Sequence, residues 1–114
     1  MDRNELPEVL VNHIKNSNML DINQYLSSFS DMAMIEEHSI GNNLYGKEEI
    51  KSYFQDYFIN YHTHTEILEY KVKESYVEMH VLFKGSFPGN EIGGLYEFFI
   101  EDNKIVRLVA DLEK

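Results

Sequence analysis

The chain has 114 residues, with 20 Asp and Glu against 10 Lys and Arg, a net charge of −10 at pH 7, and no cysteine. This length predicts one domain over residues 1–114, and the hydrophobic fraction of 43% is enough for a core. Phosphate backbones and anionic lipids repel so acidic a chain, so we expect neither nucleic acid nor a membrane as a partner. The lack of cysteine excludes disulfides and thiol chemistry. No export signal is visible, so we expect a cytoplasmic protein.

Three segments of the first half have the apolar period of an amphipathic helix. Asp21 is the expected N-cap of the second, and the third begins after Gly46. The apolar stripes are Leu6, Val9, Leu10, His13 and Ile14 in the first helix; Ile22, Tyr25, Leu26 and Phe29 in the second; and Ile50, Tyr53, Phe54, Tyr57, Phe58 and Tyr61 in the third.

The apolar period changes from 3.6 to two in the second half, which predicts strands. Asp102 and Asn103 form a tight hairpin turn between the last two. This order predicts an α+β fold: a curved, mixed but mainly antiparallel sheet, with three helices from the N-terminal half closing a cone-shaped pocket. The expected strands are 32–38, 63–73, 76–87, 94–101 and 104–112.

One stretch of the sequence resembles a known family. A helix led by Asp21, the segment FSDMAMIEE over 29–37 and the helix start GKEEI over 46–50 are similar to the pattern of the nuclear transport factor 2-like superfamily. That pattern is an Asp-led helix, an F-x-D-x-A-x-V/I-x-D/E strand and a G-x-x-x-I helix start. The superfamily includes SnoaL-like polyketide cyclases and ketosteroid isomerases. Because it holds enzymes, binding modules and scaffolds, the resemblance implies the fold more strongly than the chemistry.

The resemblance to the isomerases implies roles for three residues. Glu37 falls where those enzymes keep the carboxylate that moves a proton. His13 falls on the first helix where they keep a hydrogen-bonding Tyr, and Glu97 falls where they keep a protonated carboxylic acid beside the substrate carbonyl. All three positions are substituted here, with Glu for Asp twice and His for Tyr once.

The residues themselves leave two interpretations at each position. Glu37 shares a strand face with Ala33 and Ile35, where partial desolvation suits a general base, or it marks the strand end and meets water. His13 contacts a ligand, or it is a core histidine with one hydrogen bond. Glu97 is a buried neutral acid that donates to an enolate, or it pairs with Arg107 on the next strand.

The expected pocket is lined by Tyr53, Tyr57, Val81, Phe83 and Phe99, although aromatic stripes also serve as core.

A metal site is a weaker hypothesis. His62, His64 and Glu66 share one face if this segment is a strand, and two His with a carboxylate suit a transition metal. The alternative is that the two His cap a helix or face solvent. The sequence therefore predicts neither a metal nor a cofactor for the main site.

Two functions follow from these observations. The first is a cofactor-independent isomerase or cyclase that moves a proton next to a carbonyl of a small apolar substrate, with Glu37 as base and His13 and Glu97 stabilising the enolate. The alternative is a non-catalytic ligand-binding or dimerisation module of the same fold. We also expect a homodimer through the outer sheet face, on an apolar patch of Leu82, Tyr96, Phe98 and Ile100.

Overall fold

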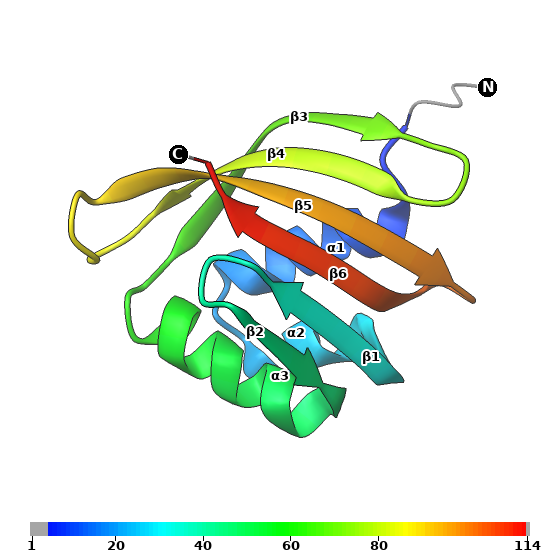
Figure 1. The fold of residues 1–114 in the computed structure, drawn as a ribbon, viewed down its shortest axis with the longest axis horizontal. Helices are drawn as coiled ribbons and strands as arrows, with labels where there is room; N and C mark the ends of the chain where they lie inside the picture. Colours follow the sequence, from blue (N-terminus) through cyan, green and yellow to red (C-terminus); the bar gives the residue numbers. More distant parts are fainter. Residues whose placement is uncertain (1–4, 114) are drawn as a thin grey trace.

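Six strands form one bent sheet with helices on one side of it (Figure 1). The computed structural model describes residues 5–113. The face on which the helices pack is called the helix face below, and the opposite one the outer face. The elements are α1 Glu8–Asn18, α2 Ile22–Ser27, β1 Phe29–Glu37, β2 Asn42–Tyr45, α3 Gly46–Phe54, a π-helical turn Gln55–Ile59, β3 His64–Val72, β4 Val77–Lys84, β5 Glu91–Glu101 and β6 Lys104–Leu112.

The strands are ordered β2-β1-β6-β5-β4-β3 across the sheet. β1 and β6 run parallel, and every other neighbouring pair is antiparallel. Hairpins link β3, β4, β5 and β6 in succession, while α3 and the π-helical turn carry the chain from the β2 edge to β3 at the other edge (Figure 1). This is the predicted mixed, mainly antiparallel α+β sheet, so the fold class is confirmed.

The predicted starts of the second and third helices are confirmed. The Asp21 side chain caps α2 by accepting a hydrogen bond from the Gln24 N–H at 3.2 Å. The third helix begins at Gly46, but its α-helical part ends at Phe54 and the chain continues as the π-helical turn. The wider turn breaks the predicted stripe, because Phe58 stays buried while Tyr57 is 42% exposed.

Strand boundaries differ from the prediction in β1, β4 and β5, and β4 ends at Lys84 rather than at residue 87. Phe29 does not lie on the second helix but begins β1, and β5 begins at Glu91 rather than at residue 94. The short strand β2 was not predicted. Asn42 and Asn43 are unfavourable strand residues, so only the pairing of β2 with β1 reveals it.

The core lies between the helices and the helix face. Tyr96 and Phe98 of β5 belong to this core, at 6% and 0% exposure, so the prediction that they form an outer patch is wrong. Ile100 also packs against the core, which leaves only Leu82 of the predicted patch on the outer face. The alternation along β5 was predicted correctly but assigned to the wrong faces. No helix within residues 5–113 is both long and apolar enough to span a lipid bilayer.

Candidate functional site

A cavity of about 350 Å³ opens at one end of the helix face. It lies where β1 and β4 end, β5 begins and β6 ends, beneath α3 and the π-helical turn. Aromatic rings form most of its wall, and the Glu37 carboxylate enters it from the end of β1. Its lining residues are Glu37, Ser39, Ile40, Tyr53, Tyr57, Phe58, Tyr61, Thr63, Phe83, Phe87, Pro88, Glu91, Ile92, Tyr96, Ala110, Asp111 and Leu112.

Glu37 is the buried acid of this cavity, with 5% exposure at the last residue of β1. The Tyr53 hydroxyl, from α3, donates to Glu37 Oε2 at 2.5 Å. The Ser39 hydroxyl and backbone N–H donate to Oε1 at 2.7 and 3.2 Å. Both oxygens therefore accept hydrogen bonds from neutral donors. These bonds offset the loss of water around the charge and fix the direction of the carboxylate.

Three buried tyrosines surround Glu37. Burial, followed by the charges of neighbouring Tyr96 and Glu37, raises the pKa of the Tyr53 hydroxyl well above its ordinary value. Burial also raises the pKa of Tyr96, and Tyr25 and Glu37 add to the effect. The pKa of Tyr25 rises for the same reasons, burial first and then Glu37. At neutral pH these phenols are uncharged hydrogen-bond donors beside a carboxylate.

Gly94 shapes the side of the cavity formed by the sheet. A Cβ at this position would overlap the Phe83 ring, so the missing side chain lets that ring lie against β5. Phe83 in turn packs edge-on against Phe58 and Tyr96, with ring centroids 5.9 and 5.7 Å apart. Gly94 therefore serves to let the Phe83 ring pack against the strand, and it does not form a turn.

His13 lies in the core and not on the cavity wall, which differs from the prediction. It is 2% exposed, and its ring centroid is 4.7 Å from Tyr25, 5.3 Å from Phe29 and 5.6 Å from Phe98. Its Nδ1 is buried without a hydrogen-bond partner. Burial lowers the pKa of His13 to about 3, so the imidazole is neutral at pH 7. Tyr25, whose pKa Glu37 helps to raise, is in contact with the His13 ring.

Glu97 and Phe99 lie on the outer face, so the prediction that they reach the pocket is wrong. Glu97 is opposite Glu78 on β4 and Val109 on β6, whereas the buried Tyr96 and Phe98 beside it face the helices. Phe99 stacks on Tyr76 with ring centroids 5.3 Å apart.

The alternative prediction for Glu97, a pair with Arg107, is also wrong. Arg107 Nε donates to Glu36 Oε2 at 2.6 Å, and its guanidinium lies 5.0 Å from the centre of the Phe99 ring. The nearest neighbours of Arg107 are therefore Glu36 and Phe99 on the outer face.

Tyr53, Tyr57 and Phe83 line the cavity as expected, while Val81 is fully buried beneath the cavity wall and does not line it. Sequence reasoning missed Tyr96, Ser39 and the acids Glu91 and Asp111. Tyr96 was discoverable, since it alternates with Glu97 and one of the two must face the helices. No local signal pointed to Ser39, which reaches Glu37 only through the turn after β1.

The metal hypothesis is not supported by the positions of its residues. His62 lies in the turn before β3 with a φ of 53°, so the strand period does not reach it. Glu66 pairs instead with Lys84 at 3.3 Å. Across residues 5–113, no three His, Asp or Glu side chains are placed to hold a metal ion together.

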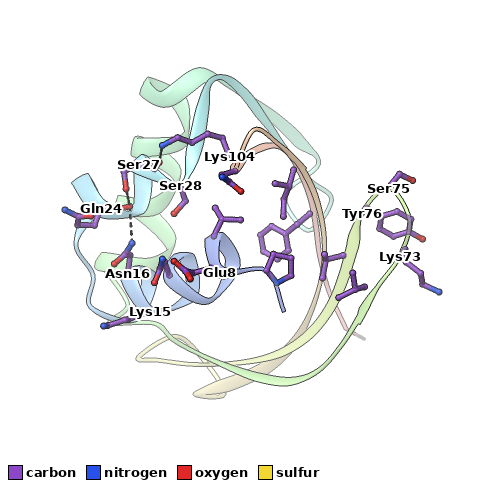
Figure 2. Close-up of a pocket in the computed structure, with 18 of the residues that line it drawn as sticks. Glu8, Lys15, Asn16, Gln24, Ser27, Ser28, Lys73, Ser75, Tyr76 and Lys104 are labelled. Atoms are coloured by element: carbon purple, nitrogen blue, oxygen red, sulfur yellow. Dashed lines mark hydrogen bonds between the residues drawn. The ribbon is translucent and has the colours of Figure 1, made fainter. Parts of the chain in front are cut away.

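A second, larger hollow of about 1090 Å³ lies at the opposite ends of β5 and β6, next to α1 and α2 (Figure 2). Its labelled side chains are mostly polar and of both charges. Several of them bond to nearby backbone, as Lys104 does to the Ser27 carbonyl at 2.7 Å and Asn16 to that of Gln24 at 3.3 Å. None of the predicted catalytic residues lines it, so the cavity at Glu37 is the candidate site.

Known proteins share the fold of this chain, although no protein-family model and no curated protein matches its sequence. A candidate polyketide cyclase from Sinorhizobium meliloti is 23% identical, with a TM-score of 0.84 over 92% of this chain and 94% of that one. A candidate ketosteroid isomerase from Kribbella flavida is 8% identical, with a TM-score of 0.82 over 95% of this chain and 77% of that one.

A third structure comes from Catenulispora acidiphila. It is a hypothetical protein with a ketosteroid isomerase-like fold, in complex with trimethylamine. It is 14% identical, with a TM-score of 0.82 over 93% of this chain and 85% of that one. At such identities the likeness establishes the fold and leaves the chemistry open. The chain therefore shares the fold of ketosteroid isomerase-like and nuclear transport factor 2-like proteins, as its sequence pattern predicted.

Proposed function

We propose that the cavity at Glu37 binds a small, mainly apolar molecule and that Glu37 moves a proton next to a carbonyl group of that molecule, without a cofactor. The observation that carries this proposal is a carboxylate at 5% exposure on an aromatic cavity, held by Tyr53 and Ser39. Within the described residues Glu37 has no ion pair, so no cation blocks its access to a substrate proton.

In the proposed reaction, the C–H bond next to the carbonyl breaks and its proton passes to a Glu37 oxygen. The electron pair of that bond moves into the carbonyl, and the enolate oxygen takes the negative charge. Tyr96 lines the same cavity as a neutral phenol and is the donor that we assign to this oxygen, in place of Glu97. Return of the proton to another carbon completes an isomerisation, and attack of the enolate carbon on a second carbonyl completes a cyclisation.

The structurally similar proteins support this proposal only through the general class of protein to which they belong. Candidate cyclases and isomerases share the fold, and the Catenulispora protein shows that a chain of this fold accommodates a small organic molecule. The alternative is a binding module without catalysis. It is favoured by the three hydrogen bonds that Glu37 already accepts, because they occupy both carboxylate oxygens that would take a substrate proton.

Deuterium exchange separates the two functions. A panel of small ketones and enones is incubated with the protein in D2O, and NMR follows deuterium entering next to the carbonyl. Glu37→Gln should slow the exchange by about two orders of magnitude, the usual contribution of a general base. Glu97→Gln, on the outer face, is the control and should leave the rate unchanged.

The catalytic proposal fails if the panel shows no exchange, or if Glu37→Gln exchanges as fast as the unchanged protein. A binding module would instead show saturable binding of panel members with nearly the same affinity in Glu37→Gln. The homodimer through the outer face stays a prediction. Light scattering that finds a monomer at micromolar concentration would contradict it.

A further inference from the structure

The charged groups on the cavity wall have one sign. Glu37 is the carboxylate that the sheet turns toward the helices, and the other ionisable side chains of the wall are tyrosines. Glu91 and Asp111 belong only to the rim, because they alternate with the inward-facing Ile92 and Ala110 and point toward the outer face. Among the residues that the structure describes, no Lys, Arg or His lines this cavity. This contrasts with the hollow in Figure 2, where Lys15, Lys73 and Lys104 accompany the acids. The cavity at Glu37 therefore disfavours an anionic ligand and favours a cation.

The wall also offers the faces and edges of many rings. The π-cloud of an aromatic ring attracts a cation within about 6 Å of its centre, and alkylammonium groups are commonly bound in this way. Tyr53 and Tyr57 lie side by side with ring centroids 5.5 Å apart, and Phe58 is 5.8 Å from Tyr53. The complete aromatic lining is Tyr53, Tyr57, Phe58, Tyr61, Phe83, Phe87 and Tyr96.

The approach to the cavity has the same sign. A shallower groove shares Ile40, Tyr53 and Tyr57 with it and is lined by the acids Glu48, Glu49 and Asp56. No basic residue of the described chain lines that groove. A hollow of low dielectric bordered by acids concentrates the field and raises the local concentration of cations. This arrangement steers a positively charged molecule toward Glu37.

We propose that the ligand of this cavity is a small organic cation, an alkylammonium compound whose alkyl groups lie against the rings while its charge is balanced by Glu37. The inference rests on the proposed function in taking the same cavity as the site, and it names the substrate class. It also fits the proposed chemistry, because a positive charge near a carbonyl makes the adjacent C–H more acidic and stabilises the enolate.

Choline and 3,3-dimethylbutan-1-ol are a matched pair of probes, since they have nearly the same shape and differ in the positive charge. Each is titrated into the full chain, and calorimetry and ¹H–¹⁵N NMR give the affinity and the residues that shift. We expect choline to bind at least about fivefold more tightly than the alcohol, the range of a cation among aromatic rings. Added salt should weaken the binding of choline more than that of the alcohol.

Variants that keep Glu37 test which acids make the protein prefer a cation to a neutral ligand. Glu48→Gln combined with Asp56→Asn, in the acidic groove beside the cavity, should weaken choline by about threefold or more and leave the alcohol unchanged, as expected for partly screened charges. Glu97→Gln combined with Glu78→Gln removes the same charge from the outer face and is the control. The inference is overturned if the alcohol binds as tightly as choline, if choline does not bind, or if both double variants weaken choline equally.

This experiment and the exchange assay fail independently. Exchange of neutral ketones that depends on Glu37, without selective binding of choline, would reject the cationic substrate and keep the catalytic proposal. Selective binding of choline, with no exchange in any carbonyl compound, would keep the cationic ligand and reject catalysis.

Discussion

The two faces of the sheet use the same alternation of residues for opposite purposes. On the helix face Tyr96 and Phe98 are buried, and Glu37 is held by neutral donors on the wall of a cavity. On the outer face Glu97 and Phe99, their immediate neighbours, meet other side chains at the surface. One position along β5 therefore decides whether a side chain reaches a ligand or reaches solvent.

The outer face carries a network of charges. Arg107 bonds to Glu36, and two histidines each lie near two acids. His38 is 3.7 Å from Glu36 and 4.0 Å from Asp111, and His80 is 3.7 Å from Glu69 and 3.0 Å from Glu113. These four acids thus have cationic or titratable neighbours, whereas Glu37 accepts hydrogen bonds from hydroxyl and amide donors. This difference separates a surface acid from a candidate base.

The largest expected effect on stability tests the difference between buried and outward-facing residues of β5. Phe98→Ala should lower the free energy of unfolding by about 3–5 kcal/mol, since it removes a ring of 0% exposure from the core. Phe99→Ala, one residue further, removes an outer-face ring that stacks on Tyr76 and lies beside Arg107, and should lower it by about 1 kcal/mol. Urea denaturation measures both, and equal losses would contradict the assignment of faces.

A second comparison concerns two tyrosines that both line the cavity. Tyr53→Phe removes the donor to Glu37 Oε2 and should destabilise the protein by about 2 kcal/mol, the usual contribution of a hydrogen bond to a charged group. Tyr57→Phe removes a hydroxyl from a side chain that is 42% exposed, and should change stability by less than about 0.5 kcal/mol. Thermal and urea unfolding at pH 7 test this difference. If Tyr53→Phe left the free energy of unfolding unchanged, the hydrogen bond to Glu37 would not contribute to stability.

His13 predicts a pH dependence of comparable size. Its pKa is about 3 in the folded protein and near 6.5 in the unfolded chain, so between these values only the unfolded chain binds the proton. Stability therefore decreases as the pH falls below about 6.5, by roughly 2 kcal/mol at pH 5 from this residue alone. His13→Leu should lose less stability than the unchanged protein over that interval. Parallel pH profiles of the two proteins would contradict a buried neutral imidazole.

The smallest expected effect on stability concerns an ion pair on the outer face. Arg107→Gln breaks the bond to Glu36 and the contact with the Phe99 ring, and should cost about 1 kcal/mol because the arginine is 43% exposed. The loss should shrink at high salt, and the affinity of a ligand in the cavity should not change. Denaturation at two salt concentrations, with ligand titration alongside, checks both expectations.

Much of the fold was predictable because its signals are local. The capping residue Asp21, the helical stripes and the alternation in β4 each depend on neighbours a few residues apart. The order of elements then resembled a known superfamily. The π-helical turn and β2 were not predictable in this way, because the first is a change of hydrogen-bond spacing and the second exists only through its partner strand.

The candidate site was predictable in its acid and in part of its aromatic wall, but not in the groups that hold the acid. The position of Glu37 follows from the strand pattern before it, and the aromatic stripe of α3 indicates Tyr53. The wrong placement of Glu97 arose because the alternation of a strand does not state which face is covered. That choice is made by pairing across the sheet, as in the register of Glu97 with Glu78 and Val109.

The close approach of Phe83 to Gly94 has a consequence for how such proteins diverge. Because a Cβ at position 94 would overlap the Phe83 ring, a single methyl group there would push that ring toward Phe58 and narrow the chamber. The residue at position 94 of β5 thus limits the size of ligand that fits the cavity, and Glu37 and Tyr53 are not changed by a substitution there. Exchange of glycine for alanine at this one codon would retune selectivity by size in a single evolutionary step.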